Sequence, residues 1–174
     1  VRVSNTAVLG QLDHGWAVCE DTLRYERLCL SAVRIGAARR AFEYALDYAK
    51  TRHQFGKPIS SFQVTQHKFA DMKVMLDTSF TMIRRYAWLM ENGKAERADT
   101  AVIKYYIGES YKTIADMCLQ ILGGYGYSME YPMQRFFRDS RLAVIGAGSS
   151  EIQRNIIGEK ILGLSREPEA KSDK

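Results

Sequence analysis

The stretch LCLSAVRIGAARRAFEYALDYAK, residues 28–50, decides the fold of this chain. Apolar residues recur in it every seven positions, with two alanines in the same stripe: Leu28, Ile35, Ala38, Phe42, Ala45 and Ala49. Such a stripe is typical of the buried face of an α-helix. We expect this helix to run from about Gly15 to Arg52, because the glycine and proline of HQFGKP, residues 53–58, would end it.

A second long helix is predicted after Ser60, where Ser60 and Gln63 fit a capping box, and it ends at Asn92-Gly93. Its apolar positions step by three, four and seven residues: Phe62, Phe69, Met72, Leu76, Phe80, Ile83, Ala87 and Met90. This second stripe would pack against the first.

Three more helices complete the pattern. A third long helix carries apolar residues from Ile103 to Leu122, and a short one spans about 132–142. The last begins at Ser149-Ser150, where Ser150 and Gln153 again fit a capping box, and ends near Gly163. Three long helices with short connections predict an all-α, up-down helical bundle with two shorter C-terminal helices.

The ends of the chain differ from this pattern. Val1, Val3, Ala7 and Val8 predict a β-strand that would belong to a sheet outside this chain. The chain begins Val1-Arg2-Val3 rather than with methionine, so we expect it to be part of a longer protein. Residues 165–174 are charged and poor in apolar side chains, and we expect a disordered tail.

Composition excludes several classes of function. The chain has 174 residues and a net charge of +5, with basic and acidic residues interleaved, so nucleic acid binding is not required. Cys19, Cys29 and Cys118 lack CxxC spacing, which argues against a disulfide framework or a zinc site and fits a reducing compartment. No apolar run approaches the ~20 residues of a membrane-spanning helix.

Two junctions between loops and helices could bind a ligand. Gly123-Gly124-Tyr125-Gly126 ends a helix, whereas a dinucleotide-binding GxGxxG motif begins one, so these glycines fit either a helix C-cap or close approach of a ligand to the backbone. Gly146-Ala147-Gly148-Ser149-Ser150 precedes a helix, whose free N–H groups suit a phosphate or a carbonyl oxygen, although plain capping fits equally well. These residues alone do not decide between the alternatives.

Three ordered blocks of sequence resemble the C-terminal helical domain of flavin-dependent acyl-CoA dehydrogenases. The first is YAKTRHQFGK, residues 48–57, with Phe62-Gln63. The second is QILGGYGY, residues 120–127, continuing through Glu130-Tyr131-Pro132 to Arg138-Asp139, and the third is IGAGSSEIQ, residues 145–153. On this resemblance, residues 1–12 would end a middle β domain and residues 13–164 would form the helical domain.

The resemblance implies an enzyme that removes the α proton and the β hydride of an acyl-CoA thioester, with FAD taking the hydride. It also implies a homotetramer built as a dimer of dimers, and an electron-transfer flavoprotein as acceptor. The FAD-binding residues would come largely from the neighbouring subunit, except for the segment at the last helix. By position they are Arg52, Gln54, Phe55, Gln63, Gln120, Ile121, Leu122, Gly123, Gly124, Ser149, Ser150 and Glu151.

One departure concerns the catalytic base. Many members carry a glutamate immediately before the Gly-Thr/Ser of the third block, where this chain has Ala147. Isovaleryl-CoA and some long-chain members instead place the base in a Glu-Arg-Leu context on the first long helix, and this chain has Glu26-Arg27-Leu28 there. The resemblance therefore implies Glu26 as the base. The residues implied near the substrate are Arg24, Tyr25, Arg27, Ala147 and Gly148.

Two other functions remain open at this point. One is an acyl-CoA oxidase or another flavin enzyme of the same fold, and the other is a non-catalytic helical subunit of a heteromeric dehydrogenase. Gly146 and Ala147 are small where other members of the family carry bulkier side chains, and the room this leaves near the α and β carbons favours a branched or medium-chain acyl group. The expected compartment is the bacterial cytoplasm or the mitochondrial matrix.

Overall fold

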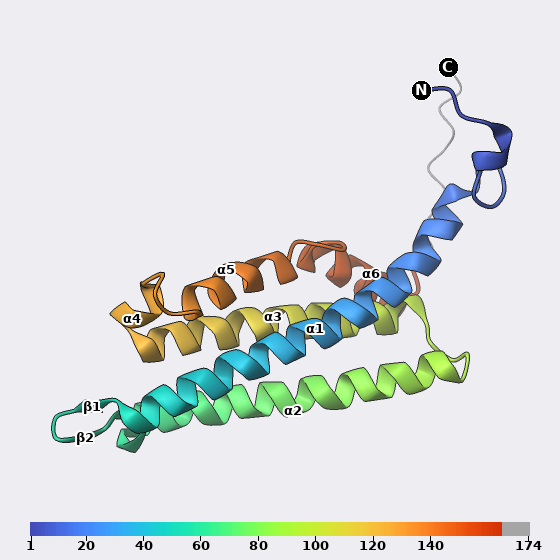
Figure 1. The fold of residues 1–174 in the computed structure, drawn as a ribbon. Helices are drawn as coiled ribbons and strands as arrows, with labels where there is room; N and C mark the ends of the chain where they lie inside the picture. Colours follow the sequence, from blue (N-terminus) through green and yellow to red (C-terminus); the bar gives the residue numbers. More distant parts are fainter. Residues whose placement is uncertain (165–174) are drawn as a thin grey trace.

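A computed structural model describes residues 1–164 as a helical bundle (Figure 1). Three long helices run up, down and up: α1 (Gly15–Thr51), α2 (Gln63–Glu91) and α3 (Arg97–Leu122). Three shorter ones follow: α4 (Gly124–Tyr127), α5 (Met133–Ala143) and α6 (Ser150–Leu162). The predicted all-α, up-down architecture is confirmed, and α4 is an additional single turn.

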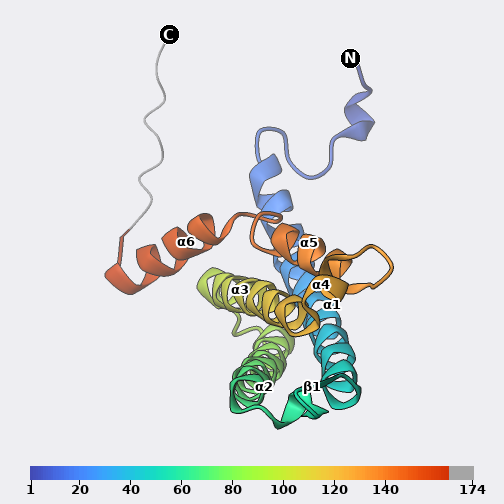
Figure 2. The same cartoon turned by 90° about the vertical axis from the view of Figure 1, so that its left-hand side faces the viewer.

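Helix α3 is the centre of the bundle. It packs against α1, α2, α5 and α6, and Figure 2 shows these helices arranged around it. Alanines on α1 allow the closest approach, because Ala41, Ala45 and Ala49 are completely buried. Ala41 and Ala45 pack in one cluster with apolar side chains of α2, α3 and α5, including Met72 and Ile114. Burial of such side chains is the main source of bundle stability.

The stripe predicted for α2 is only partly buried. Met72 and Leu76 lie in the core, whereas Phe80 is 38% exposed and Ala87 is exposed. Ser79 and Tyr86 are buried instead. The reason is geometric: a helix of 3.6 residues per turn drifts by about 20° per heptad against a strict seven-residue repeat. Over the 29 residues of α2 the buried face therefore moves off the original stripe.

A short hairpin connects α1 and α2. Strands β1 (His53–Gln54) and β2 (Lys57–Pro58) pair antiparallel, and a 3-10 turn, η2 (Ile59–Ser61), leads into α2. The two residues between the strands, Phe55 and Gly56, have φ angles of 54° and 78°. Two successive positive φ values match the two-residue hairpin turn that follows the right-handed twist of strands.

Both predicted capping boxes are wrong. Phe62 and Ser149 are the N-cap residues of α2 and α6, and neither makes a side-chain capping hydrogen bond. Ser60 belongs to the 3-10 turn η2, so the N-cap of the helix lies two residues later than the motif indicated. The side chains of Ser150 and Gln153 are buried and bind other partners, described below.

The predicted N-terminal β-strand is also absent from residues 1–12. Asn5–Ala7 form a 3-10 turn, η1, and no residue of this segment pairs with a strand. The segment extends away from the bundle (Figures 1 and 2). A strand needs a partner to receive its backbone hydrogen bonds, and none lies within reach here. The predicted disordered tail, residues 165–174, lies outside the described residues.

None of the described helices combines the length and the apolar character needed to cross a bilayer.

Candidate functional site

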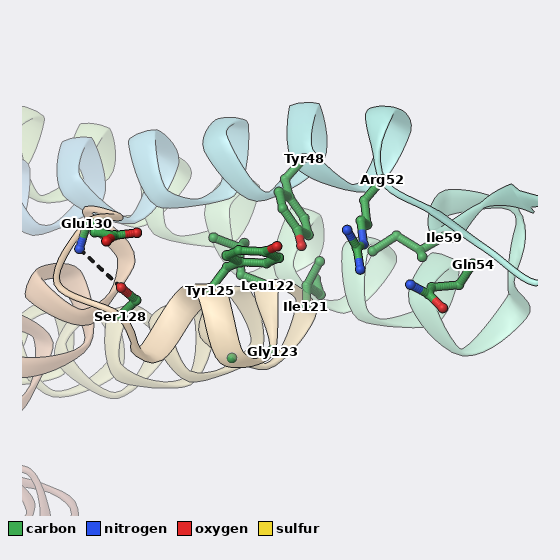
Figure 3. Close-up of a pocket in the computed structure, with 11 residues that line it drawn as sticks. Tyr48, Arg52, Gln54, Ile59, Ile121, Leu122, Gly123, Tyr125, Ser128 and Glu130 are labelled. Atoms are coloured by element: carbon green, nitrogen blue, oxygen red, sulfur yellow. Dashed lines mark hydrogen bonds between the residues drawn. The ribbon is translucent and has the colours of Figure 1, made fainter.

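A cleft of about 590 Å³ opens where the end of α1 and the hairpin meet the α3–α4 junction (Figure 3). It is formed by segments that lie far apart in the sequence. Its lining residues are Tyr48, Arg52, Gln54, Ile59, Ile121, Leu122, Gly123, Gly124, Tyr125, Ser128 and Glu130.

Arg52 provides the positive charge of this cleft. Its guanidinium carbon lies 5.6 Å from the centre of the Tyr125 ring, and Tyr125 in turn packs edge-on against Tyr48 at 6.3 Å. Burial raises the pKa of the Tyr48 hydroxyl above its ordinary value, and the Arg52 charge opposes this rise. The aromatic rings therefore hold the guanidinium in place while leaving its N–H groups for an anionic ligand.

The glycines of the α3–α4 junction give this cleft its floor. Gly123 ends α3 with a φ of 60°, so the C-cap interpretation of this motif is confirmed. A Cβ atom built on Gly123 or Gly124 meets nothing within 4 Å, so a side chain at either position would project into open space. Gly126 differs, because a Cβ there would lie 2.6 Å from the carbonyl oxygen of Leu119.

The structure brings together only part of the predicted cofactor set. Arg52, Gln54, Ile121, Leu122, Gly123 and Gly124 all line the cleft. Phe55 stands at the hairpin tip with 92% of its surface exposed, and it packs on Phe62 rather than into the cleft. Gln63 and Gln120 are exposed and are not among the lining residues.

A second group of predicted residues meets near the start of α6. The Arg27 side chain, which is 6% exposed, donates a hydrogen bond from Nε to the Ala147 carbonyl oxygen at 3.3 Å. This contact joins residues that are 120 positions apart and brings the Glu-Arg-Leu segment of α1 to the loop 144–149. Glu26 precedes Arg27 on α1 and is exposed, so its carboxylate is open to a ligand.

Arg24 and Tyr25 lie on the adjoining surface. Arg24 donates a hydrogen bond from a guanidinium nitrogen to the Ala95 carbonyl oxygen at 2.7 Å. Tyr25 is 64% exposed. Both line a shallow depression with Met90, Gly93 and Ala95, so Arg24 is held by the loop that connects α2 and α3.

The predicted segment Ser149-Ser150-Glu151 begins α6. Ser150 is buried and donates from Oγ to Oε1 of Glu109 on α3 at 2.7 Å. Hydrogen bonds from Lys112 and Ser150 keep the pKa of Glu109 below its ordinary value, although burial opposes them. Ser150 therefore ties α6 to α3, whereas Ser149 and Glu151 stand nearer the surface.

Two further cations are buried close to Arg27. Lys104 on α3 is fully buried, and Arg34 on α1 is 7% exposed. Burial, together with the charges of Arg34 and Arg27, lowers the pKa of Lys104 from 10.5 to about 8. The Lys104 Nζ and the Arg34 Nη1 atoms have no hydrogen-bond partner among the described residues.

Sequence reasoning missed several residues of these sites. Tyr48 and Tyr125 lie inside the two blocks that carried the resemblance, and the spacing of four between Tyr48 and Arg52 places both on one helix face. Gln153 was assigned to a capping box, but it is fully buried and binds backbone carbonyls. A polar residue at a core position of a helix was the available signal, since such residues are usually hydrogen-bonded.

The chain is similar to several known proteins. A family model described as "Acyl-CoA dehydrogenase, C-terminal domain" matches residues 13–162. The probable acyl-CoA dehydrogenase YngJ of Bacillus subtilis (strain 168) is 38% identical over 162 residues, which cover 93% of this chain and 43% of that protein. The mitochondrial isovaleryl-CoA dehydrogenase of Oryza sativa subsp. japonica is 40% identical, over 91% of this chain and 39% of that protein.

Solved structures include a glutaryl-coenzyme A dehydrogenase in complex with glutaryl-CoA. It superimposes with a TM-score of 0.89 at 33% identity, over 94% of this chain and 42% of that chain. The chain thus spans about two fifths of the length of the relatives it matches.

Proposed function

The chain belongs to the acyl-CoA dehydrogenase family, as its C-terminal domain, and on this premise we propose that the complete protein desaturates an acyl-CoA thioester between its α and β carbons. The observation that carries the proposal is the hydrogen bond from Arg27 to Ala147. It joins the helix segment that holds Glu26 to the loop where many members carry their base. Ala147 has no acidic group, and in this proposal Glu26, the neighbour of Arg27 on α1, supplies one.

Glu26 acts as the base in this proposal. The C–H bond at the α carbon breaks, an O–H bond forms on the Glu26 carboxylate, and the hydride leaves from the β carbon. The products are the α,β-unsaturated thioester and a protonated Glu26, and the hydride would pass to a bound cofactor. An N–H group of the loop 144–149 would polarise the thioester carbonyl and stabilise the negative charge that develops on its oxygen.

FAD is the cofactor we propose, and when bound it supplies the acceptor for the hydride. The residues of the cleft fit this group. A guanidinium held over an aromatic ring suits a pyrophosphate, and the open space above Gly123 and Gly124 would be filled by side chains at either position. Arg52, Gln54, Gly123 and Gly124 would hold the adenosine and pyrophosphate portion.

In this proposal the base and the cleft of one chain belong to different sites. Glu26 lies near the start of α1 and Arg52 is the C-cap residue of this continuous helix, so a rise of 1.5 Å per residue separates them by about 39 Å. One dinucleotide cannot bridge that length. We therefore propose that the cleft of one subunit completes the site of a neighbour, in a homotetramer built of dimers.

The experiment that tests the function is anaerobic bleaching of the flavin in the full-length protein, with butyryl-, isovaleryl- and octanoyl-CoA as substrates. Glu26→Gln should lower the bleaching rate by about 10²–10⁴-fold with FAD retained, because the amide cannot accept the α proton. The matched control is Glu43→Gln, which removes an exposed carboxylate from the same helix and should leave the rate unchanged.

Each outcome of this experiment is informative. If the flavin bleaches in the wild type and equally fast in Glu26→Gln, the assignment of the base is refuted, while the proposed function stands. No bleaching by any of the thioesters would refute the function itself. Reoxidation of the reduced protein by an electron-transferring flavoprotein, without rapid peroxide formation in air, would support a dehydrogenase over an oxidase.

A further inference from the structure

The loop between α5 and α6 holds an uncommon backbone conformation. Ala147 and Gly148 have φ angles of 57° and 88°, so two consecutive residues lie in the left-handed region. For a residue with a Cβ atom, such as Ala147, this conformation is sterically unfavourable. It persists only where the surrounding structure holds it in place.

Two buried side chains donate hydrogen bonds to the carbonyl oxygens of this loop. Gln153 donates from Nε2 to the carbonyl oxygens of Ala147 and Gly148, at 3.3 Å and 3.1 Å. Arg27 donates to the same Ala147 oxygen at 3.3 Å. Gln153 is fully buried and Arg27 is nearly so. The Ala147 carbonyl is therefore fixed by donors from two different helices.

The contact between Gln153 and the loop requires glycine at position 148. A Cβ atom on Gly148 would lie 2.6 Å from Nε2 of Gln153. The other amide atom, Oε1, is buried and has no partner among the described residues. Because carbonyl oxygens repel one another, only the Nε2 atom can face the two carbonyls. Gln153 thus donates from Nε2 to both carbonyl oxygens, while its Oε1 acceptor stays without a partner among the described residues.

This arrangement sets the direction of the loop's N–H groups. In a planar trans peptide the N–H points opposite to the C=O. With the Ala147 and Gly148 carbonyls turned toward Gln153, the N–H groups of Gly148 and Ser149 point to the other side of the loop. Neither donates a hydrogen bond within the part of the chain that the structure describes.

We propose that Gln153, together with Arg27, is a positioning residue for the dehydrogenation. It holds the Ala147 and Gly148 carbonyls inward and so keeps the outward N–H groups of the loop aimed at the thioester oxygen. The inference rests on the proposed function, in which this loop polarises that carbonyl. It gives Gln153 a part in the reaction without contact to substrate or cofactor.

The test compares Gln153→Leu with wild type in the full-length protein, using whichever of butyryl-, isovaleryl- or octanoyl-CoA bleaches the wild-type flavin fastest. Leucine keeps most of the volume and removes both donors. We expect kcat to fall by about 10-fold or more, in line with the loss of a preorganised donor, with KM within about threefold and the FAD content unchanged. Gln134→Leu, a glutamine replaced on the neighbouring helix α5, should retain wild-type kcat.

A second variant and a second measurement distinguish a positioning role of Gln153 from a purely structural one. Gln153→Asn keeps the amide but is one methylene too short to reach both carbonyls, and it should show the same fall in kcat at constant KM. Hydrogen exchange of the 144–150 segment should be faster in both variants, since the Ser150 N–H to Val144 carbonyl bond, 2.9 Å long, closes this loop.

Several results would overturn the inference. They are wild-type kcat in Gln153→Leu or Gln153→Asn, a rise in KM without a fall in kcat, or a loss of rate that only follows loss of FAD. Failure of the wild type to bleach with any thioester would instead refute the proposed function, so the two failures are distinguishable.

Discussion

Lys104 is a fully buried cation on the central helix, and Arg27 and Arg34 are the charges that act on it most strongly. Its Nζ atom has no hydrogen-bond partner among the described residues. Burial is the main cause that lowers its pKa from 10.5 to about 8. The folded state therefore holds this proton less tightly than the unfolded state does, and the charged form destabilises the fold.

The sign of the pH dependence follows from these two pKa values. Below pH 8 both states are protonated and the full destabilisation is present. Between about pH 8 and 10.5 the unfolded state binds more protons than the folded state, so stability rises with pH across this window. The destabilisation by Lys104 is therefore largest well below pH 8 and is lost by the upper end of this window.

We predict that Lys104→Met stabilises the protein by up to about 3 kcal/mol at pH 7 and reduces the rise in stability between pH 8 and 10. Denaturant unfolding across this pH range measures both effects. Lys73→Met, which removes an exposed lysine paired with Asp77, should change stability by less than about 1 kcal/mol. A Lys104→Met protein that is less stable than wild type would contradict this account.

At the scale of elements, the α3–α4 junction depends on one close backbone contact. Gly126 is buried and packs directly on the carbonyl oxygen of Leu119, in the last turns of α3. No side chain fits between these two backbones without displacement. The junction also sets the position of Gly123, Gly124 and Tyr125 in the cleft.

We predict that Gly126→Ala destabilises the protein by roughly 1–3 kcal/mol and weakens FAD retention, because the added methyl group forces α4 away from α3. Thermal unfolding and flavin content of the purified protein measure the two effects. Gly158→Ala is the matched control, since a Cβ at this position in α6 meets nothing within 4 Å. The control should be neutral or slightly stabilising. If the two variants were equally stable, the close contact with the Leu119 carbonyl oxygen would not be the reason for a glycine at position 126.

Helix ends were predicted less well than helix faces, for reasons visible in particular residues. Ser60 and Ser150 each satisfied a local capping pattern, but neither is an N-cap. Ser150 instead bonds Glu109 of α3. Capping depends on a few local hydrogen bonds of about 1 kcal/mol each, and a tertiary partner of similar strength can replace them.

For the whole molecule, the length of α1 separates the two predicted halves of the site. Glu26 and the Arg52 cleft lie about 39 Å apart along one helix. If a neighbour's cleft completes each site, then the two residues that serve one reaction come from different subunits. This arrangement can be distinguished from one site per chain by mixing subunits.

We predict complementation between Arg52→Ala and Glu26→Gln subunits. Arg52→Ala alone should lose FAD and Glu26→Gln alone should lose turnover. A mixed dimer contains one site with both wild-type residues, so co-expression of the two variants as full-length proteins should restore activity. Flavin bleaching of the mixed protein, isolated through two affinity tags, measures this. Mixed dimers as inactive as either parent would contradict a site shared between subunits.

The sequence by itself determined the helices and their order. Periodic apolar residues over long stretches, with glycine and proline at their ends, leave few alternatives, as in α1 with its buried Ile35, Ala38, Ala45 and Ala49. The resemblance of three ordered blocks also identified the family, and six of the cofactor-binding residues that it implies line the cleft. Local patterns of this kind need no knowledge of distant contacts.

Only the tertiary structure decided which side chains meet. The bond from Arg27 to Ala147 spans 120 residues, and the contacts of Gln153 with the loop depend on how α6 packs against α3. Burial of Lys104 likewise results from helices that surround it on several sides. A periodic pattern specifies the face of each helix, but the partner across that face is set by packing of the whole bundle.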